Sequence, residues 1–260
     1  MLAAAIWGFV AGSALLLGGF MALHRQWSTR AIGLFMAFGS GVLISSVAFE
    51  LVEEALELGG GGPTTLGMTA GALTFFGGDL LVSRRGRPHR QRGSAGSSPD
   101  DPQVEPVEPV GEEASNPMAI VLGAVLDGVP EAAAIGISLL DSGRVGGTFV
   151  IAVFLSNVPE ALSATAGLAQ SGRPPRTIMR MWWSVAAVST LTAAAGYALL
   201  DGASDGALAA LSAYAAGAVL TMVASTMLPE AHREGGPISA LVTTGGFLLA
   251  VLIGSLAQAV

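Results

Sequence analysis

The chain has 260 residues, of which 52% are hydrophobic and only 12% are charged. Soluble domains carry about 25% charged residues, so this composition excludes an ordinary soluble domain and indicates an integral membrane protein. The absence of cysteine excludes disulfides and thiolate metal ligands, and the formal net charge of −7, partly due to one acidic loop, gives no indication of nucleic-acid binding.

Eight apolar runs are each long enough to cross a hydrocarbon core of roughly 30 Å, which takes about 20 helical residues. We therefore expect an all-α membrane protein with eight transmembrane helices, in which residues 1–260 form a single transmembrane domain in contact with the lipid bilayer. The predicted spans are 2–23, 31–52, 63–83, 117–140, 145–169, 178–200, 205–228 and 237–258.

The arginines predict the orientation of these spans. The chain has no lysine, and its arginines lie almost entirely in the loops after the first, third, fifth and seventh spans, with Arg144 as the exception. Because basic residues concentrate in cytoplasmic loops, we expect a multi-pass protein of the plasma or inner membrane with both termini extracytoplasmic.

One long polar segment, 84–116, interrupts the apolar runs. It begins with arginines, becomes acidic and rich in proline, and has no apolar periodicity. These features predict a disordered cytoplasmic loop between the third and fourth spans.

Two similar pentads lie near the middle of the fourth and fifth spans. The first, 127–131, reads Asp-Gly-Val-Pro-Glu, and the second, 156–160, reads Ser-Asn-Val-Pro-Glu. Residues four positions apart share a helix face, so Asp127 points the same way as Glu131, and Ser156 the same way as Glu160. Each proline also leaves the carbonyl four residues earlier without its donor, which predicts helices broken around a site at mid-membrane depth.

Charged side chains at the membrane centre are costly, at about 2.5–3.5 kcal/mol or more each, and usually serve a function. Since the turn between the two spans is short, we expect them to be antiparallel neighbours whose pentads face each other and hold a divalent metal ion. The alternative is that Asp127, Glu131 and Glu160 are protonated and hydrogen-bonded across the bundle without a metal.

At these pentads the chain resembles the ZIP (Zrt/Irt-like) family of divalent metal transporters. That family has a His-Asn-x-Pro-Glu-Gly motif in its fourth span and a Pro-Glu motif in its fifth. Further similar segments lie at the ends of spans 2, 3 and 7, at 49–55, 78–81 and 228–232. The resemblance covers the whole chain except the loop 84–116.

The resemblance implies a 3+2+3 arrangement of helices with an inverted repeat, spans 1–3 against spans 6–8, and a homodimer. It also implies transport of a divalent metal towards the cytoplasm by alternating access. Carried over residue by residue, the implied metal ligands are Asp127, Glu131, Ser156, Asn157 and Glu160. The implied candidates for the entrance and exit of the ion are Glu50, Glu54, Asp79, Glu230 and His232.

The chain departs from the family pattern at several of these positions. Asp127 stands where the family usually has His, Gly128 stands where it has Asn, and a glutamate of the sixth span is replaced by Ser189 or Thr190. The second, adjacent metal position is therefore reduced to the shared glutamates and Asn157. The remaining ligands are all oxygens, which suit manganese, magnesium or calcium better than zinc, although zinc also accepts carboxylates. Zinc is the family's usual substrate, so zinc and manganese or iron(II) both stay open as the transported ion.

Two other classes of function are weighed against transport. A ZIP-like membrane protein that has lost tight metal binding is the first, and the missing histidines favour it. A membrane-embedded enzyme is the second. It is disfavoured because the sequence has no His-Glu-x-x-His motif and no phosphate-binding loop. We expect no enzymatic activity and no prosthetic group.

Overall fold

The structure is a computed structural model, and it describes residues 1–86, 117–141 and 147–258. Of the loop predicted at 84–116, residues 87–116 lie outside the described residues. The elements, in chain order, are α1 (Leu2–His24), α2 (Thr29–Ser46), η1 (Val47–Val52), α3 (Glu53–Gly59), α4 (Gly61–Gly86), α5 (Pro117–Asp141), α6 (Gly147–Gln170), α7 (Pro175–Leu200), α8 (Asp205–Met222), η3 (Val223–Met227), α9 (Leu228–Gly235) and α10 (Ser239–Gln258).

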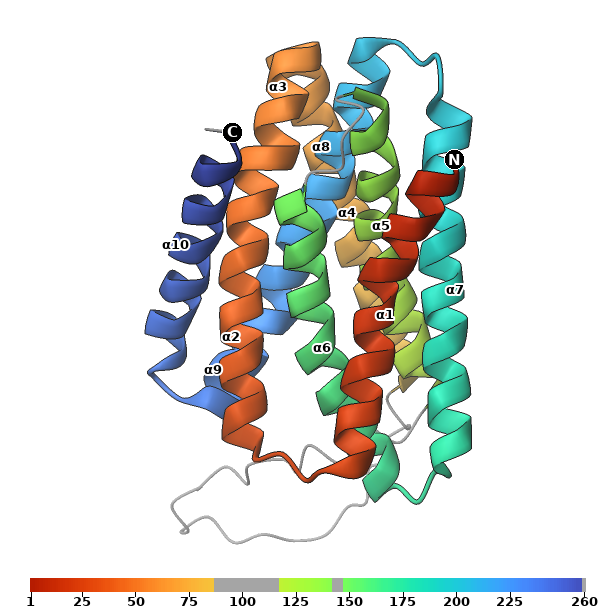
Figure 1. The fold of residues 1–260 in the computed structure, drawn as a ribbon, viewed down its shortest axis with the longest axis vertical. Helices are drawn as coiled ribbons and strands as arrows, with labels where there is room; N and C mark the ends of the chain where they lie inside the picture. The colour runs from red at the N-terminus through yellow and green to blue at the C-terminus, as the bar shows by residue number, and fades with distance from the viewer. Residues whose placement is uncertain (87–116, 142–146, 259–260) are drawn as a thin grey trace, which may run out of the picture.

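These elements form a bundle of long helices that run alternately up and down (Figure 1). The described residues contain no strand, so the all-α prediction is confirmed. We call the end of the bundle at which α1 begins and α10 ends the terminal end. We call the opposite end the arginine end, because the links from α1 to α2 and from α6 to α7, with Arg25 and Arg173, lie there together with Arg233 of α9.

Seven helices in the described part of the chain are both long and apolar enough to cross a membrane. The eighth predicted span corresponds to α4, which has 26 residues and is thus long enough. Its many glycines and threonines, and the arginines at its end, lower its hydropathy. The boundaries of spans 1, 3, 4, 5, 6 and 8 agree with the predictions to within three residues.

Spans 2 and 7 extend beyond their predicted ends. In each, a long α-helix passes through a short π-helical segment, η1 or η3, and continues as a short α-helix, giving one helical run of 31 residues, Thr29–Gly59 or Asp205–Gly235. Each run is followed by a glycine with positive φ, Gly60 at 69° and Gly236 at 74°. Glycine adopts this conformation without a steric penalty.

The packing of these helices follows the inverted repeat. In one half, α4 packs along α8, and in the other half α10 packs along α2. A Cβ on Gly71 of α4 would meet the Tyr214 carbonyl oxygen of α8, and a Cβ on Gly246 of α10 would meet the Phe38 carbonyl oxygen of α2. Such close backbone contacts need small residues, as is common between membrane helices.

The two central helices have different partners. α6 packs mainly on α1 and α2, whereas α5 packs mainly on α7 and α8. A Cβ on Gly8 or Gly12 of α1 would meet Ala193 or Ala186 of α7, and a Cβ on Gly136 of α5 would meet the Ala193 carbonyl oxygen. These glycines of the first and fourth spans therefore face α7.

Candidate metal-transport site

The first pentad lies within α5, which stays helical through Pro130. Asp127 is half-buried, whereas Glu131 is 2% exposed. The Oε2 atom of Glu131 is buried and has no hydrogen-bond partner. A buried carboxylate oxygen without a partner is costly, so this position calls for a proton or a cation.

The second pentad lies within α6, which also continues through its proline, Pro159. Ser156 is 1% exposed, Asn157 is 6% exposed and Glu160 is half-buried. The Ser156 hydroxyl donates to the Val153 carbonyl oxygen of its own helix at 2.9 Å. Its oxygen lone pairs can therefore still accept a hydrogen bond or bind a cation.

The prediction that the prolines break the two site helices is wrong, since both helices continue. The carbonyl that Pro159 releases belongs to Leu155, and it lies against α2, because a Cβ on Gly39 would be 3.3 Å from its oxygen. On the other side, a Cβ on Gly18 of α1 would meet the Val158 carbonyl oxygen. Close glycine contacts thus place the backbone of the second pentad between α1 and α2, and this stretch is helical despite the missing N–H.

The two pentads influence each other by charge more than by direct helix packing. Glu160 lies within electrostatic range of Asp127, Glu131 and Glu230. The two helices run antiparallel, as expected, but α5 and α6 touch each other little. Among the residues that the structure describes, no three His, Asp or Glu side chains stand close enough together to hold one metal ion.

Gly128 faces α7 rather than a neighbouring carboxylate. A Cβ on Gly128 would lie 3.3 Å from the hydroxyl oxygen of Ser189, which is 6% exposed. Thr190 instead donates to the Ala186 carbonyl oxygen one turn back on its own helix at 2.8 Å. Of the two residues left open in the sixth span, Ser189 is the one that lies beside the first pentad, and it places a neutral hydroxyl there.

The candidates for the entrance and exit lie at the two ends of the bundle. Glu50 and Glu54 lie in η1 and α3 towards the terminal end, and Glu50 Oε2 accepts a hydrogen bond from the backbone N–H of Phe149 at 3.0 Å. Asp79 of α4 lies within electrostatic range of Asp127. The other interpretation of Asp79 is an ion pair with Arg84 or Arg85, and the side chains of both arginines lie outside the described part of the structure.

Towards the arginine end, α9 contributes the remaining candidates. Glu230 Oε1 accepts a hydrogen bond from the Ser163 hydroxyl of α6 at 3.1 Å. His232 is exposed, and its Nδ1 lies 3.3 Å from the Ser239 hydroxyl. Glu230 is thus the candidate that directly joins the α9 end to the helix of the second pentad.

Sequence reasoning missed Glu234. Its side chain is only 10% exposed, and its Oε2 has no hydrogen-bond partner, although Arg233 lies 3.9 Å from Oε1. Glu234 follows Glu230 by four residues and therefore shares its helix face. That spacing was visible in the sequence, but the burial of the side chain was not.

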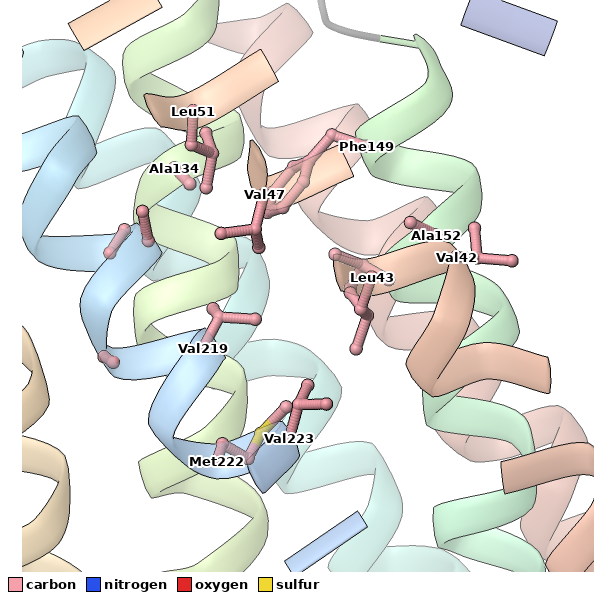
Figure 2. Close-up of a cluster of buried hydrophobic side chains, with 14 of the residues drawn as sticks. Val42, Leu43, Val47, Leu51, Ala134, Phe149, Ala152, Val219, Met222 and Val223 are labelled. Carbon is pink, nitrogen blue, oxygen red and sulfur yellow. The ribbon is translucent and has the colours of Figure 1, made fainter. Parts of the chain in front are cut away.

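Apolar side chains pack on the terminal-end side of the pentads (Figure 2). The cluster includes Ala134 of α5, which follows Glu131, and Phe149 and Ala152 of α6, which precede Ser156. Because α5 runs towards the terminal end and α6 runs away from it, these residues lie between the pentads and that end. The same cluster draws on both π-helical regions, through Val47, Leu51, Met222 and Val223.

The comparisons with known proteins agree with this architecture. The family described as ZIP Zinc transporter matches residues 1–257, essentially the whole chain. A search of the curated proteins finds no match. The chain therefore belongs to the ZIP zinc transporter family, and its all-helical bundle with paired Pro-Glu pentads agrees with that membership.

Proposed function

We propose that this protein is a secondary transporter that moves a divalent cation past the two pentads by alternating access. Membership of the ZIP family supports divalent metal transport in general. The observation that carries the site is Glu131, a fully buried carboxylate with an unpartnered oxygen in the middle of a membrane helix. Such groups in membrane proteins mark ion pathways.

In this proposal the ion binds to the oxygens of Asp127, Glu131, Ser156, Asn157 and Glu160. The described conformation holds these carboxylates within range of one another's charges without gathering three of them at one point. Binding therefore includes an approach of α5 and α6. A divalent cation offsets the repulsion between the carboxylates that the approach increases, so the bound ion itself favours this movement.

The donor set bears on which ion is carried. Every proposed ligand is an oxygen. Asp127 stands where the family usually has a histidine, and the side chain beside Gly128 is the neutral hydroxyl of Ser189 rather than a carboxylate. Oxygen donors favour harder cations such as manganese, and zinc also accepts carboxylates; iron(II) is the third candidate ion. We propose a single-ion site for these divalent metals.

The path continues from the pentads towards the arginine end. Glu160, then Ser163 with Glu230, and then Glu234 supply oxygens along the boundary of α6 and α9. On the terminal-end side of the pentads, the apolar side chains of Ala134, Phe149 and Ala152 are buried in the cluster and supply no oxygen ligand. Since basic loops face the cytoplasm, we propose that this conformation faces inward and that both termini are extracytoplasmic. The homodimer, which the resemblance implies, and the location in the plasma or inner membrane both stay predictions.

Uptake into proteoliposomes tests the proposal, with zinc, manganese and iron(II) offered separately. We expect at least one ion to enter faster with the unaltered protein than with the variant carrying Glu131→Gln and Glu160→Gln. Because changes to the outer partners of metal ligands already cost about 10–100-fold in affinity, the loss is expected to be about tenfold or more.

The matched control is Glu57→Gln, which removes one exposed carboxylate from α3 and should leave uptake unchanged. Equal uptake of every ion by the unaltered protein and the double variant would contradict transport through the pentads. That result would favour the alternative of a ZIP-like membrane protein without transport.

A further inference from the structure

Glu50 makes a contact that an ion-attracting entrance residue does not need. Its Oε2 accepts a hydrogen bond from the backbone N–H of Phe149 at 3.0 Å, and this bond joins span 2 to the beginning of α6. The two residues lie far apart in the sequence and on different parts of the bundle, so the bond is a tertiary contact.

The position of Phe149 in α6 gives the bond its physical meaning. α6 begins at Gly147, so the N–H of Phe149 is one of the first-turn donors that have no acceptor within the helix. A carboxylate is favoured there because the aligned peptide dipoles leave partial positive charge at a helix N-terminus. Glu50 therefore acts as a helix cap supplied by a different span.

The same residue of α6 also fills the terminal-end side of the path. The Phe149 side chain is 2% exposed and belongs to the apolar cluster, together with Val47 and Leu51 of η1 (Figure 2). The segment η1 and Phe149 are thus related in two ways: their side chains share one apolar cluster, and the Glu50 carboxylate binds the Phe149 backbone. Both contacts lie on the terminal-end side of Ser156.

We propose that Glu50 is a positioning residue that fastens the N-terminus of α6 to span 2 and so keeps the terminal end of the path closed in this conformation. The proposal rests on the proposed function, because it concerns access to the pentads. The competing role is that of an acidic entrance residue that attracts cations without holding α6. Glu57, exposed on α3 at the same end, supplies a matched carboxylate for that comparison.

The experiment uses the absence of cysteine in the chain. Single cysteines replace Ala152 or Ala161, which are both on α6 and both 0% exposed. Ala152 lies in the apolar cluster on the terminal-end side of the second pentad, and Ala161 lies on its arginine-end side in a separate cluster. A water-soluble maleimide then measures how fast each thiol is reached in full-length protein reconstituted in lipid without metal.

In the Glu50→Ala background we expect Ala152→Cys to react about fivefold faster, the ratio that corresponds to loss of about 1 kcal/mol of closure from a helix-end charge contact. Glu50→Gln, which keeps an acceptor oxygen but loses the charge, should give a smaller increase. Ala161→Cys should react at an unchanged rate in both backgrounds, and Glu57→Ala should change neither rate.

An unchanged rate at Ala152→Cys in both Glu50 backgrounds would overturn the proposal. So would an equal increase at both reporters, which would mean a general loosening of the helix. If Glu50→Ala does not yield folded protein, the thiol reaction rates in the Glu50→Gln background alone test the proposal, by the same criteria. Thiol reaction needs no transported ion, so failure here is distinguishable from failure of the transport proposal, which is read from uptake.

Discussion

Spans 2 and 7 are built on the same backbone plan and yet hold α6 in different ways. Each begins after a serine, passes through a π-helical segment and ends at a glycine with positive φ. They run in opposite directions along the bundle (Figure 1). Span 2 contributes Glu50 to the first turn of α6, whereas span 7 contributes Glu230 to the Ser163 side chain further along the same helix.

The difference lies in the chemistry of the two contacts. Glu50 binds a backbone N–H, which any residue except proline supplies at position 149, while Glu230 binds one particular side chain. In the π-helical segment of span 7, Thr226 only donates to the Met222 carbonyl of its own helix, at 2.6 Å. Two similar backbones thus give α6 two chemically different attachments, one at its first turn and one further along the helix.

The largest expected effect tests whether the packing of α10 on α2 is equivalent to the packing of α4 on α8. A Cβ on Gly41 of α2 would meet the Thr243 carbonyl of α10, and a Cβ on Gly217 of α8 would meet the Met68 carbonyl of α4. Gly41→Val and Gly217→Val should each destabilise the fold by about 3 kcal/mol or more, because rigid backbone must move. Thermal unfolding in detergent measures both.

The controls for this pair are glycines with open space. Nothing lies within 4 Å of a Cβ on Gly245 of α10 or Gly77 of α4, so Gly245→Ala and Gly77→Ala should be well tolerated. A large loss for only one of the two valine variants would show that the repeat is not matched in its packing.

A smaller effect is expected from the attachment of span 7 to α6. Glu230→Gln, Ser163→Ala and the double variant form a thermodynamic cycle of unfolding free energies. Since the Ser163 hydroxyl donates to Glu230, we expect a coupling of about 1.5–2 kcal/mol, within the range for hydrogen bonds to charged groups. The parallel cycle of Glu230→Gln with Ser184→Ala, an exposed serine of α7 that bonds its own helix, should show no coupling. Additive losses in the Ser163 cycle would mean that Glu230 does not hold α6.

The smallest effect distinguishes the beginnings of the two spans. The Ser28 side chain accepts a hydrogen bond from the Ala31 N–H at 3.2 Å, whereas Ser204 makes no side-chain cap bond. Ser28→Ala should therefore cost about 1 kcal/mol, the usual loss for an N-cap, and Ser204→Ala should cost less. Chemical denaturation in mixed micelles compares them, and equal losses would contradict the assigned cap.

Much of this fold is predictable because its signals are local. Length and hydropathy locate the helices, and the spacing in the pentads places Asp127 on the face of Glu131. The burial of Glu131, Ser156 and Asn157 agrees with an internal site. The family resemblance, carried by short motifs, is confirmed over residues 1–257.

Other features have weak signals or none in the sequence. Pro229 lacks an N–H and lies where η3 passes into α9, so this irregularity has a visible cause. No proline lies in or next to η1, although η1 departs from α-helical geometry in the same way as η3. The prolines that were expected to break the site helices do not, since α5 continues through Pro130 and α6 through Pro159.

The sequence by itself determined the membrane class, the positions of the spans, the family and the faces of the two pentads, because each depends on neighbours within one or two helical turns. Only the tertiary structure decided that α6 packs on α1 and α2 rather than closely on α5. It also decided that Ser189 faces Gly128, that Glu234 is buried, and that Glu50 caps a helix almost a hundred residues away. These outcomes depend on which helices meet, and long-range packing rather than local periodicity sets that choice.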